Sequence, residues 1–103
     1  MNAMLIGSSS RKGVGKNSGT EYQINTLILA IPLSEADREK KFEHNTLKQS
    51  GYRIWKPDVS NTVYNQVEDE NLYEPAYVDV EVATTTNQND QLIQEVVKIT
   101  FPV

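Results

Sequence analysis

Residues 21–31, Glu-Tyr-Gln-Ile-Asn-Thr-Leu-Ile-Leu-Ala-Ile, give the clearest structural signal in this chain of 103 residues. The stretch begins with strict alternation, and every second residue therefore falls on one face of a β-strand. The residues that share this face are Tyr22, Ile24, Thr26, Ile28 and Ala30. The far end is apolar on both faces, as in a strand buried in a barrel, and Pro32 ends it. The stretch therefore predicts a buried strand in an all-β domain.

Four further segments have the apolar or alternating pattern of strands: 3–8, 51–55, 76–85 and 92–101. One face of the third is expected to hold Ala76, Val78, Val80 and Val82, and one face of the last to hold Ile93, Val97, Ile99 and Phe101. Five strands in 103 residues predict a small five-stranded antiparallel barrel with a long connection in its middle. The OB barrel fits this size and strand number, and an SH3-like barrel is the alternative.

Polar segments separate the predicted strands. Residues 8–20 contain three glycines and four serines, which predicts a loop or hairpin tip. Asp37 follows Ser34 by three residues, a spacing close to that of a capping box. This pair predicts a short helix over residues 35–43. Residues 58–75 are polar and acidic and are expected to form a connection with one helical turn, whereas residues 87–90 form a turn.

The composition excludes several classes of function. The length predicts one domain, residues 1–103, and the absence of cysteine excludes a disulfide scaffold, a thiol nucleophile and a Cys-based metal site. The single histidine, His44, lacks an acidic partner at catalytic spacing and is expected in an exposed loop. We therefore expect no enzyme, no cofactor, no metal site and no small-molecule substrate. No apolar run approaches membrane-spanning length and no signal peptide is evident, so we expect no membrane contact and a cytoplasmic location.

The charged residues divide the chain into two unlike parts. The net charge is −4, which by itself argues against a nucleic-acid partner. Residues 1–56 contain nine of the ten basic residues and five acidic ones, a net charge of +4, whereas residues 57–103 have a net charge of −8. The acidic run Glu68-Asp69-Glu70 lacks the alternation of a calcium loop and is expected to be a solvated loop. The charge asymmetry predicts a basic face, so the net charge does not exclude DNA.

The glycine-rich segment matches neither of the common nucleotide-binding motifs. A Walker A loop needs a glycine five residues before the Gly-Lys pair and a Ser or Thr directly after it, and Gly15-Lys16 has neither. The dinucleotide fingerprint fails because the spacing from Gly15 to Gly19 is one residue too long.

The same segment suits contact with a single-stranded nucleic acid. Its three cations, Arg11, Lys12 and Lys16, can displace the counterions of a phosphate chain, and glycines let the backbone approach that chain. Tyr22 follows at the start of the next strand, where its ring can stack on a base. The alternative is an ordinary flexible hairpin tip with solubilising lysines.

A second aromatic and basic cluster spans residues 52–56. On a strand, Tyr52 lies on one face and Arg53 and Trp55 lie on the other. An exposed aromatic ring between cations is typical of a platform for single-stranded nucleic acid. Trp55 can instead fill the core of so small a domain, which makes Tyr52 the better exposed candidate. Arg53 is the candidate cation of this cluster.

Residues 13–25, Gly-Val-Gly-Lys-Asn-Ser-Gly-Thr-Glu-Tyr-Gln-Ile-Asn, resemble the single-stranded DNA-binding proteins of filamentous bacteriophages, the gene V protein type. That family has Gly-Val-Ser, basic and small residues, and Gly-Lys-Pro-Tyr before an apolar strand. The chain matches it at Gly13-Val14, Lys16, Gly19 and Tyr22. Thr20 and Glu21 replace the usual Lys-Pro, which lowers the local positive charge.

The resemblance implies an OB-like fold, a homodimer, and cooperative, sequence-tolerant coating of phage DNA in the cytoplasm of a bacterial host during replication. By matched position it implies that Lys16 and Tyr22 contact DNA and that Ile24 lines the same surface. Arg11 and Lys12 belong to the same loop. No residue of the segment 33–50 is matched to the family.

Two other functions are compatible with the sequence. A phage- or plasmid-encoded β-barrel that binds proteins would show no affinity for oligo(dT), and its loop charges could be deleted freely. An enzyme would need a convergent group of titratable residues, and no such group is evident.

Overall fold

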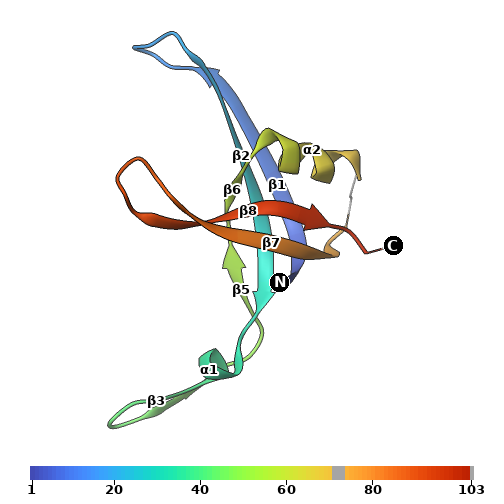
Figure 1. Cartoon of the computed structure of the whole chain (residues 1–103). Helices are drawn as coiled ribbons and strands as arrows, with labels where there is room; N and C mark the ends of the chain where they lie inside the picture. The colour runs from blue at the N-terminus through green and yellow to red at the C-terminus, as the bar shows by residue number, and fades with distance from the viewer. Residues whose placement is uncertain (71–73, 103) are drawn as a thin grey trace.

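Strand β2 (Glu21–Pro32) is the strand with the most partners in a six-stranded antiparallel sheet (Figure 1). The structure is a computed structural model that describes residues 1–70 and 74–102. The other strands of this sheet are β1 (Asn2–Val14), β5 (Tyr52–Trp55), β6 (Asp58–Val59), β7 (Ala76–Thr86) and β8 (Leu92–Thr100). Each of the five predicted strands corresponds to one of these, so the all-β prediction is confirmed.

The sheet is open along its hydrogen-bonded path. The strand order is β5-β2-β1-β7-β8, and β6 pairs with β2 beyond the end of β5. In the described part of the chain β5 and β8 do not pair with each other, so the ladder is not closed. β6 nevertheless contacts β8, which brings the two sides of the sheet together.

The core lies on one face of this sheet, here called the inner face. Along β2 the residues with odd numbers from Leu27 to Ile31 are buried, because this face packs against β7, β8 and helix α2 (Asn61–Asp69). Its other main members are Ala3, Leu5, Val59, Val63, Val67, Val78, Val80, Val96 and Ile99. The predicted inward face of residues 76–85 is thus confirmed. The opposite, outer face holds the alternating residues that begin at Tyr22.

The last strand differs from the prediction at its middle. Glu81 pairs with Lys98 but Val82 pairs with Val96, so Val97 is an extra residue in β8 that forms a bulge. The bulge changes the alternation, and Val96 and Ile99 are buried whereas Val97 is exposed. The single face predicted for Ile93, Val97, Ile99 and Phe101 is therefore wrong, since a bulge leaves no mark in a period-two pattern.

The first hairpin is longer than predicted. β1 continues to Val14, and its ladder with β2 extends from Met4 opposite Ala30 to Val14 opposite Glu21. The loop predicted over residues 8–20 is thus reduced to residues 15–20, because cross-strand pairing overrides a local composition rich in Ser and Gly. In Figure 1 this hairpin projects well beyond the rest of the sheet.

Residues 33–51 form an arm at the opposite end, where the predicted helix over 35–43 is wrong (Figure 1). Helix α1 (Glu35–Arg38) is one turn long and is followed by a hairpin of β3 (Glu39–Lys41) and β4 (Thr46–Lys48). The turn is short because none of its residues is buried, so no apolar face supports a longer helix.

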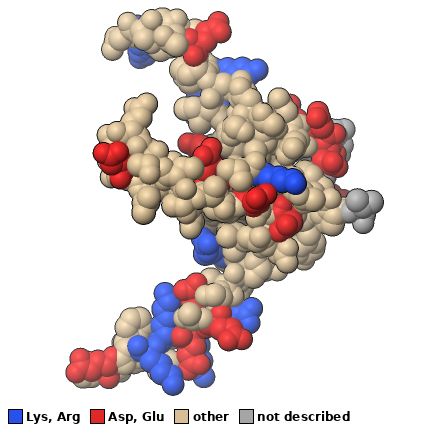
Figure 2. Space-filling model, in the orientation of Figure 1, with Lys and Arg blue, Asp and Glu red and all other residues tan. Residues whose placement is uncertain are grey.

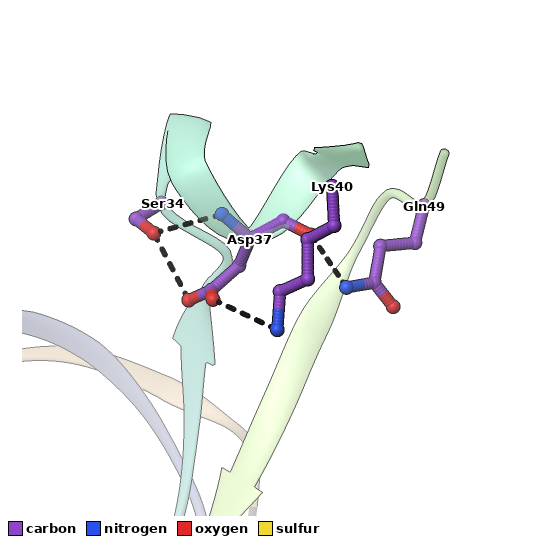
Figure 3. Close-up of polar contacts among 4 residues, drawn as sticks. All are labelled: Ser34, Asp37, Lys40 and Gln49. Carbon is purple, nitrogen blue, oxygen red and sulfur yellow. Dashed lines mark hydrogen bonds and ion pairs between the residues drawn. The ribbon is translucent and has the colours of Figure 1, made fainter. Parts of the chain in front are cut away.

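Polar contacts hold the arm together (Figure 3). The Ser34 hydroxyl accepts a hydrogen bond from the Asp37 amide at 3.2 Å and donates one to the Asp37 carboxylate at 2.9 Å. Lys40 Nζ lies 3.6 Å from that carboxylate, and the Gln49 side chain donates to the Asp37 carbonyl. The Gln49 amide also donates to the carbonyl of Arg38 at the end of α1. The capping interaction predicted at Ser34 is therefore confirmed.

The acidic connection contains more structure than one turn. α2 has nine residues, and its first turn is capped by the Ser60 hydroxyl, which accepts from the Val63 amide at 3.3 Å. Glu68 and Asp69 lie in its last turn, so the loop predicted there is wrong; residues 71–73 of the predicted connection lie outside the described residues. The Tyr64 hydroxyl donates to Glu68 at 2.7 Å, and this hydrogen bond, with partial burial, raises the pKa of Tyr64.

The Asn25 side chain links β2, to which it belongs, with β1 and α2. It is 2% exposed, its Oδ1 accepts from Ser10 at 2.8 Å and Gln23 at 2.9 Å, and its Nδ2 donates to Asn61 at 2.6 Å. Asn25→Leu would bury an aliphatic group against these polar partners. We expect this change to lower the free energy of unfolding by about 1–3 kcal/mol, measured by urea denaturation. Ser9→Ala, on the exposed face of β1, is the control and should change it by less than about 0.5 kcal/mol. Equal values for the two variants would contradict a stabilising network.

Candidate nucleic-acid interface

Three of the predicted binding residues lie together on the outer face of the first hairpin. Arg11 of β1 is directly opposite Ile24 of β2, and Tyr22 is opposite Gly13. Directly opposed residues of an antiparallel pair have their side chains on the same face, so Arg11, Ile24 and Tyr22 share one surface. All three are exposed, and no helix or further strand among the described residues covers them. The structure thus places a cation beside an aromatic and an aliphatic side chain.

Lys16 lies in the turn at the tip of this hairpin, and backbone hydrogen bonds fix the conformation of that turn. The Gly15 amide donates to the Thr20 carbonyl at 2.9 Å, and the Gly19 amide donates to the Gly15 carbonyl at 3.0 Å. Gly19 has a φ of 65°, a conformation that glycine adopts without a steric cost. Lys16 is exposed at this tip, and its side chain can reach a phosphate from beyond the end of the strands.

Lys12 does not join this group. It is opposite Gln23, and the alternation of β1 therefore directs it to the other face of the hairpin from Arg11. The hairpin is only two strands wide at this point, so Lys12 still contributes positive potential within a screening length of about 8–10 Å.

The second predicted cluster is divided between the two faces of β5. Tyr52 is opposite Pro32 and Ile54 is opposite Ala30, so these two exposed side chains continue the outer face. Arg53 is on the other side, opposite Ile31, and Trp55 packs partly against the core opposite Leu29. The alternative that Trp55 contributes to the core is thus confirmed, and sequence reasoning omitted Ile54 from the candidate site.

The two clusters occupy the two ends of one strand. Tyr22 is the second residue of β2, and Tyr52 is opposite Pro32 at the end of β2, ten positions later. At about 3.3 Å per residue, the two tyrosines are roughly 33 Å apart. The side chains between them on the outer face of β2 carry no charge. One acidic neighbour lies at the β6 edge, where Asp58 accepts a hydrogen bond from Thr26 at 2.9 Å. A polyanion on this face would therefore lie toward β1, away from Asp58.

The fold separates the charges that the sequence places in different halves. The arm, residues 33–51, carries four basic and four acidic residues and is neutral overall. The excess positive charge of the first half therefore belongs to the first hairpin and to β5 with Lys56, at +2 each. The described acidic residues after Lys56 lie mainly on α2, β7 and β8, as Figure 2 shows for the face in view. The residues on the outer face of the first hairpin include no acidic side chain.

Other kinds of site find little support in the described residues. His44 is exposed at the end of the arm, as predicted, and its Nε2 atom lies 3.9 Å from a carboxylate oxygen of Glu43. Across residues 1–70 and 74–102, no group of three or more His, Cys, Asp or Glu side chains is arranged to hold a metal ion. Helices in the same ranges are all too short or too polar to cross a membrane.

Comparison with known proteins does not place the chain in a family. No family model matches it, and no curated protein or solved structure matches it. The resemblance of residues 13–25 to the phage proteins stays a prediction, so the functional inference depends on the outer face itself.

Proposed function

We propose that this protein binds single-stranded DNA through the outer face of β1, β2 and β5, without sequence preference and without catalysis. The observation that carries the proposal is the uncharged outer face of β2, which has an exposed tyrosine at each end and cations beside the first. Its side chains are exposed or half-buried from Tyr22 to Ile28, and Ala30 is buried. Aromatic rings stack on any base, and cations follow the phosphates, so this combination is typical of sequence-tolerant binding to a single strand.

The proposed roles follow from the position of each side chain. Tyr22 and Tyr52 stack on unpaired bases, and Ile24 provides apolar contact beside the first ring. Arg11 and Lys16 contact phosphates. Lys12 and Arg53, on the other faces of their strands, strengthen the local positive potential rather than touch the bases.

The proposal includes an OB-like barrel. β1 pairs with both β2 and β7, α2 follows β6, and β6 contacts β8 across the open side. A partly open, five-stranded barrel of this kind binds oligonucleotides on the face of its second and third strands and with the loop between its first two. The outer face of β2 and β5, together with the tip at Lys16, corresponds to those positions.

The biological setting is proposed from the resemblance at residues 13–25. We propose that the protein acts as a homodimer that coats filamentous phage DNA cooperatively during replication in the cytoplasm of a bacterial host. Acidic surfaces on α2, β7 and β8 limit the affinity of one subunit, and contacts between neighbouring subunits compensate for this weakness.

A titration of the purified protein into labelled oligonucleotides tests the proposal. Fluorescence anisotropy should show binding to oligo(dT), weaker binding to duplex DNA of equal length, and affinity that falls as salt concentration rises. A sigmoidal isotherm on long oligo(dT), but not on short oligo(dT), would support cooperativity. Failure to bind at 20 mM salt would contradict the proposal and favour the protein-binding alternative.

Removing the charge at the hairpin tip should change the salt dependence. We expect Lys16→Ala to weaken binding to oligo(dT) and to reduce the slope of log K against log salt by about 0.7, the value for one phosphate contact on a single strand. Lys98→Ala on β8 removes the same charge from the acidic part of the molecule and should leave the slope unchanged. The contact is disproved if both variants keep the wild-type slope.

A further inference from the structure

The hydroxyl end of the Tyr22 ring occupies the space that a side chain at position 13 would fill. A Cβ atom built on Gly13 would be 2.5 Å from the Tyr22 Oη atom, 2.7 Å from Cζ and 3.0 Å from Cε1. The first two distances are shorter than real Cβ atoms show, so a larger residue at position 13 would require the Tyr22 ring to move from this position. The close contact is possible only because the directly opposite residue on β1 has no side chain.

The backbone itself does not require glycine at this position. Gly13 is paired within a regular ladder, whereas the glycines with positive φ are Gly19 and Gly51. Alanine is better than glycine in a strand, because it loses less conformational freedom on folding. The one structural consequence of Gly13 is therefore the space that it leaves for the ring of Tyr22.

We propose that Gly13 is a positioning residue that holds the Tyr22 ring flat as a preformed stacking platform for one unpaired base. This inference rests on the proposed function and assigns the first base-binding position to the Gly13–Tyr22 pair. The hydroxyl end of the ring lies where a Cβ atom of Gly13 would be, and the tyrosine is still 43% exposed. A ring that is already fixed loses little conformational entropy when a base stacks on it, and stacking is therefore tighter than on a free side chain.

The test separates stacking from phosphate contact with two ligands of equal length and charge. One is oligo(dT), and the other is an abasic strand that keeps the phosphates and lacks the bases. For the wild type, oligo(dT) should bind more tightly. Gly13→Ala should lower the ratio of the two affinities by roughly the same factor as Tyr22→Ala, about 5-fold or more. Thr84→Ala, at an exposed position of β7 outside the proposed binding face, should keep the wild-type ratio.

A double variant tests whether Gly13 acts through the ring. In a Tyr22→Ala background, Gly13→Ala should cause no further fall in the ratio, because the group that it displaces is absent. The same background should also remove any fall in melting temperature that Gly13→Ala causes alone, so the test holds even if the single variant is unstable. The inference would be overturned if, in that background, Gly13→Ala still lowered both the affinity ratio and the melting temperature by as much as it does alone.

The outcomes also separate this inference from the proposed function. A wild type that binds neither strand would contradict the proposed function itself. A wild type that prefers oligo(dT), with a ratio reduced by Tyr22→Ala but unchanged by Gly13→Ala, would overturn the positioning role alone.

Discussion

Tyr22→Ala should weaken the binding of oligo(dT) by about 5- to 150-fold. Stacking of one base on an aromatic ring contributes roughly 1–3 kcal/mol, and each 1.4 kcal/mol is a factor of ten in the dissociation constant. The loss should appear at every salt concentration with an unchanged slope, because tyrosine carries no charge at neutral pH and releases no counterion. Fluorescence anisotropy at three or more salt concentrations measures both the dissociation constant and the slope of its salt dependence.

Tyr77 provides a matched control on the same sheet. It is 66% exposed on β7, opposite Met4, and it lies two residues from the acidic Asp79. Tyr77→Ala removes a more exposed ring from a strand with acidic neighbours and should leave binding unchanged. If Tyr77→Ala and Tyr22→Ala weaken binding equally, exposed tyrosines contribute without regard to position, and the interface assigned to the first hairpin is wrong.

Leu27→Ala should lower the free energy of unfolding by about 2–5 kcal/mol, a large part of the 5–15 kcal/mol typical of a small domain. Leu27 is 0% exposed at the middle of β2, and truncation of its side chain leaves a cavity among the residues of β7, β8 and α2. Urea denaturation followed by circular dichroism measures the loss.

Ile24 on the same strand is the control for this effect. It is 47% exposed on the outer face, so Ile24→Ala should cost less than about 1 kcal/mol. The two truncations should thus affect different properties. Leu27→Ala lowers stability, whereas Ile24→Ala weakens oligo(dT) binding and changes stability little. Similar losses of stability would mean that β2 is covered on both faces, which would contradict an exposed binding surface.

Parts of the candidate site follow from sequence alone because they depend on local alternation. The period of two in residues 21–31 places Tyr22 and Ile24 on one face, and the structure agrees. The same reasoning named Arg11 and Lys12 together and could not tell that only Arg11 shares the face of Tyr22, because residues 8–14 have the composition of a loop. Their strand structure comes from pairing with β2, which supplies hydrogen bonds and the register that a glycine- and serine-rich segment cannot specify by itself.

The placement of Tyr52 and Arg53 shows a second limit of the sequence. Alternation assigns them to opposite faces, but it does not tell which face meets the core. That choice depends on the register of β5 on β2, where Trp55 lies opposite the buried Leu29. Once Trp55 faces inward, Tyr52 and Ile54 must face outward.

The sequence by itself determines the all-β class, the five main strands and the faces of β2 and β7, because side-chain alternation is a local property of the backbone. It also determines the unequal charge of the two halves. Only the tertiary structure decided the bulge at Val97, the length of the first hairpin, the neutral arm and the contact between Gly13 and Tyr22. Each of these depends on which residue lies opposite which, and strand register is fixed by packing between segments that are distant in the chain.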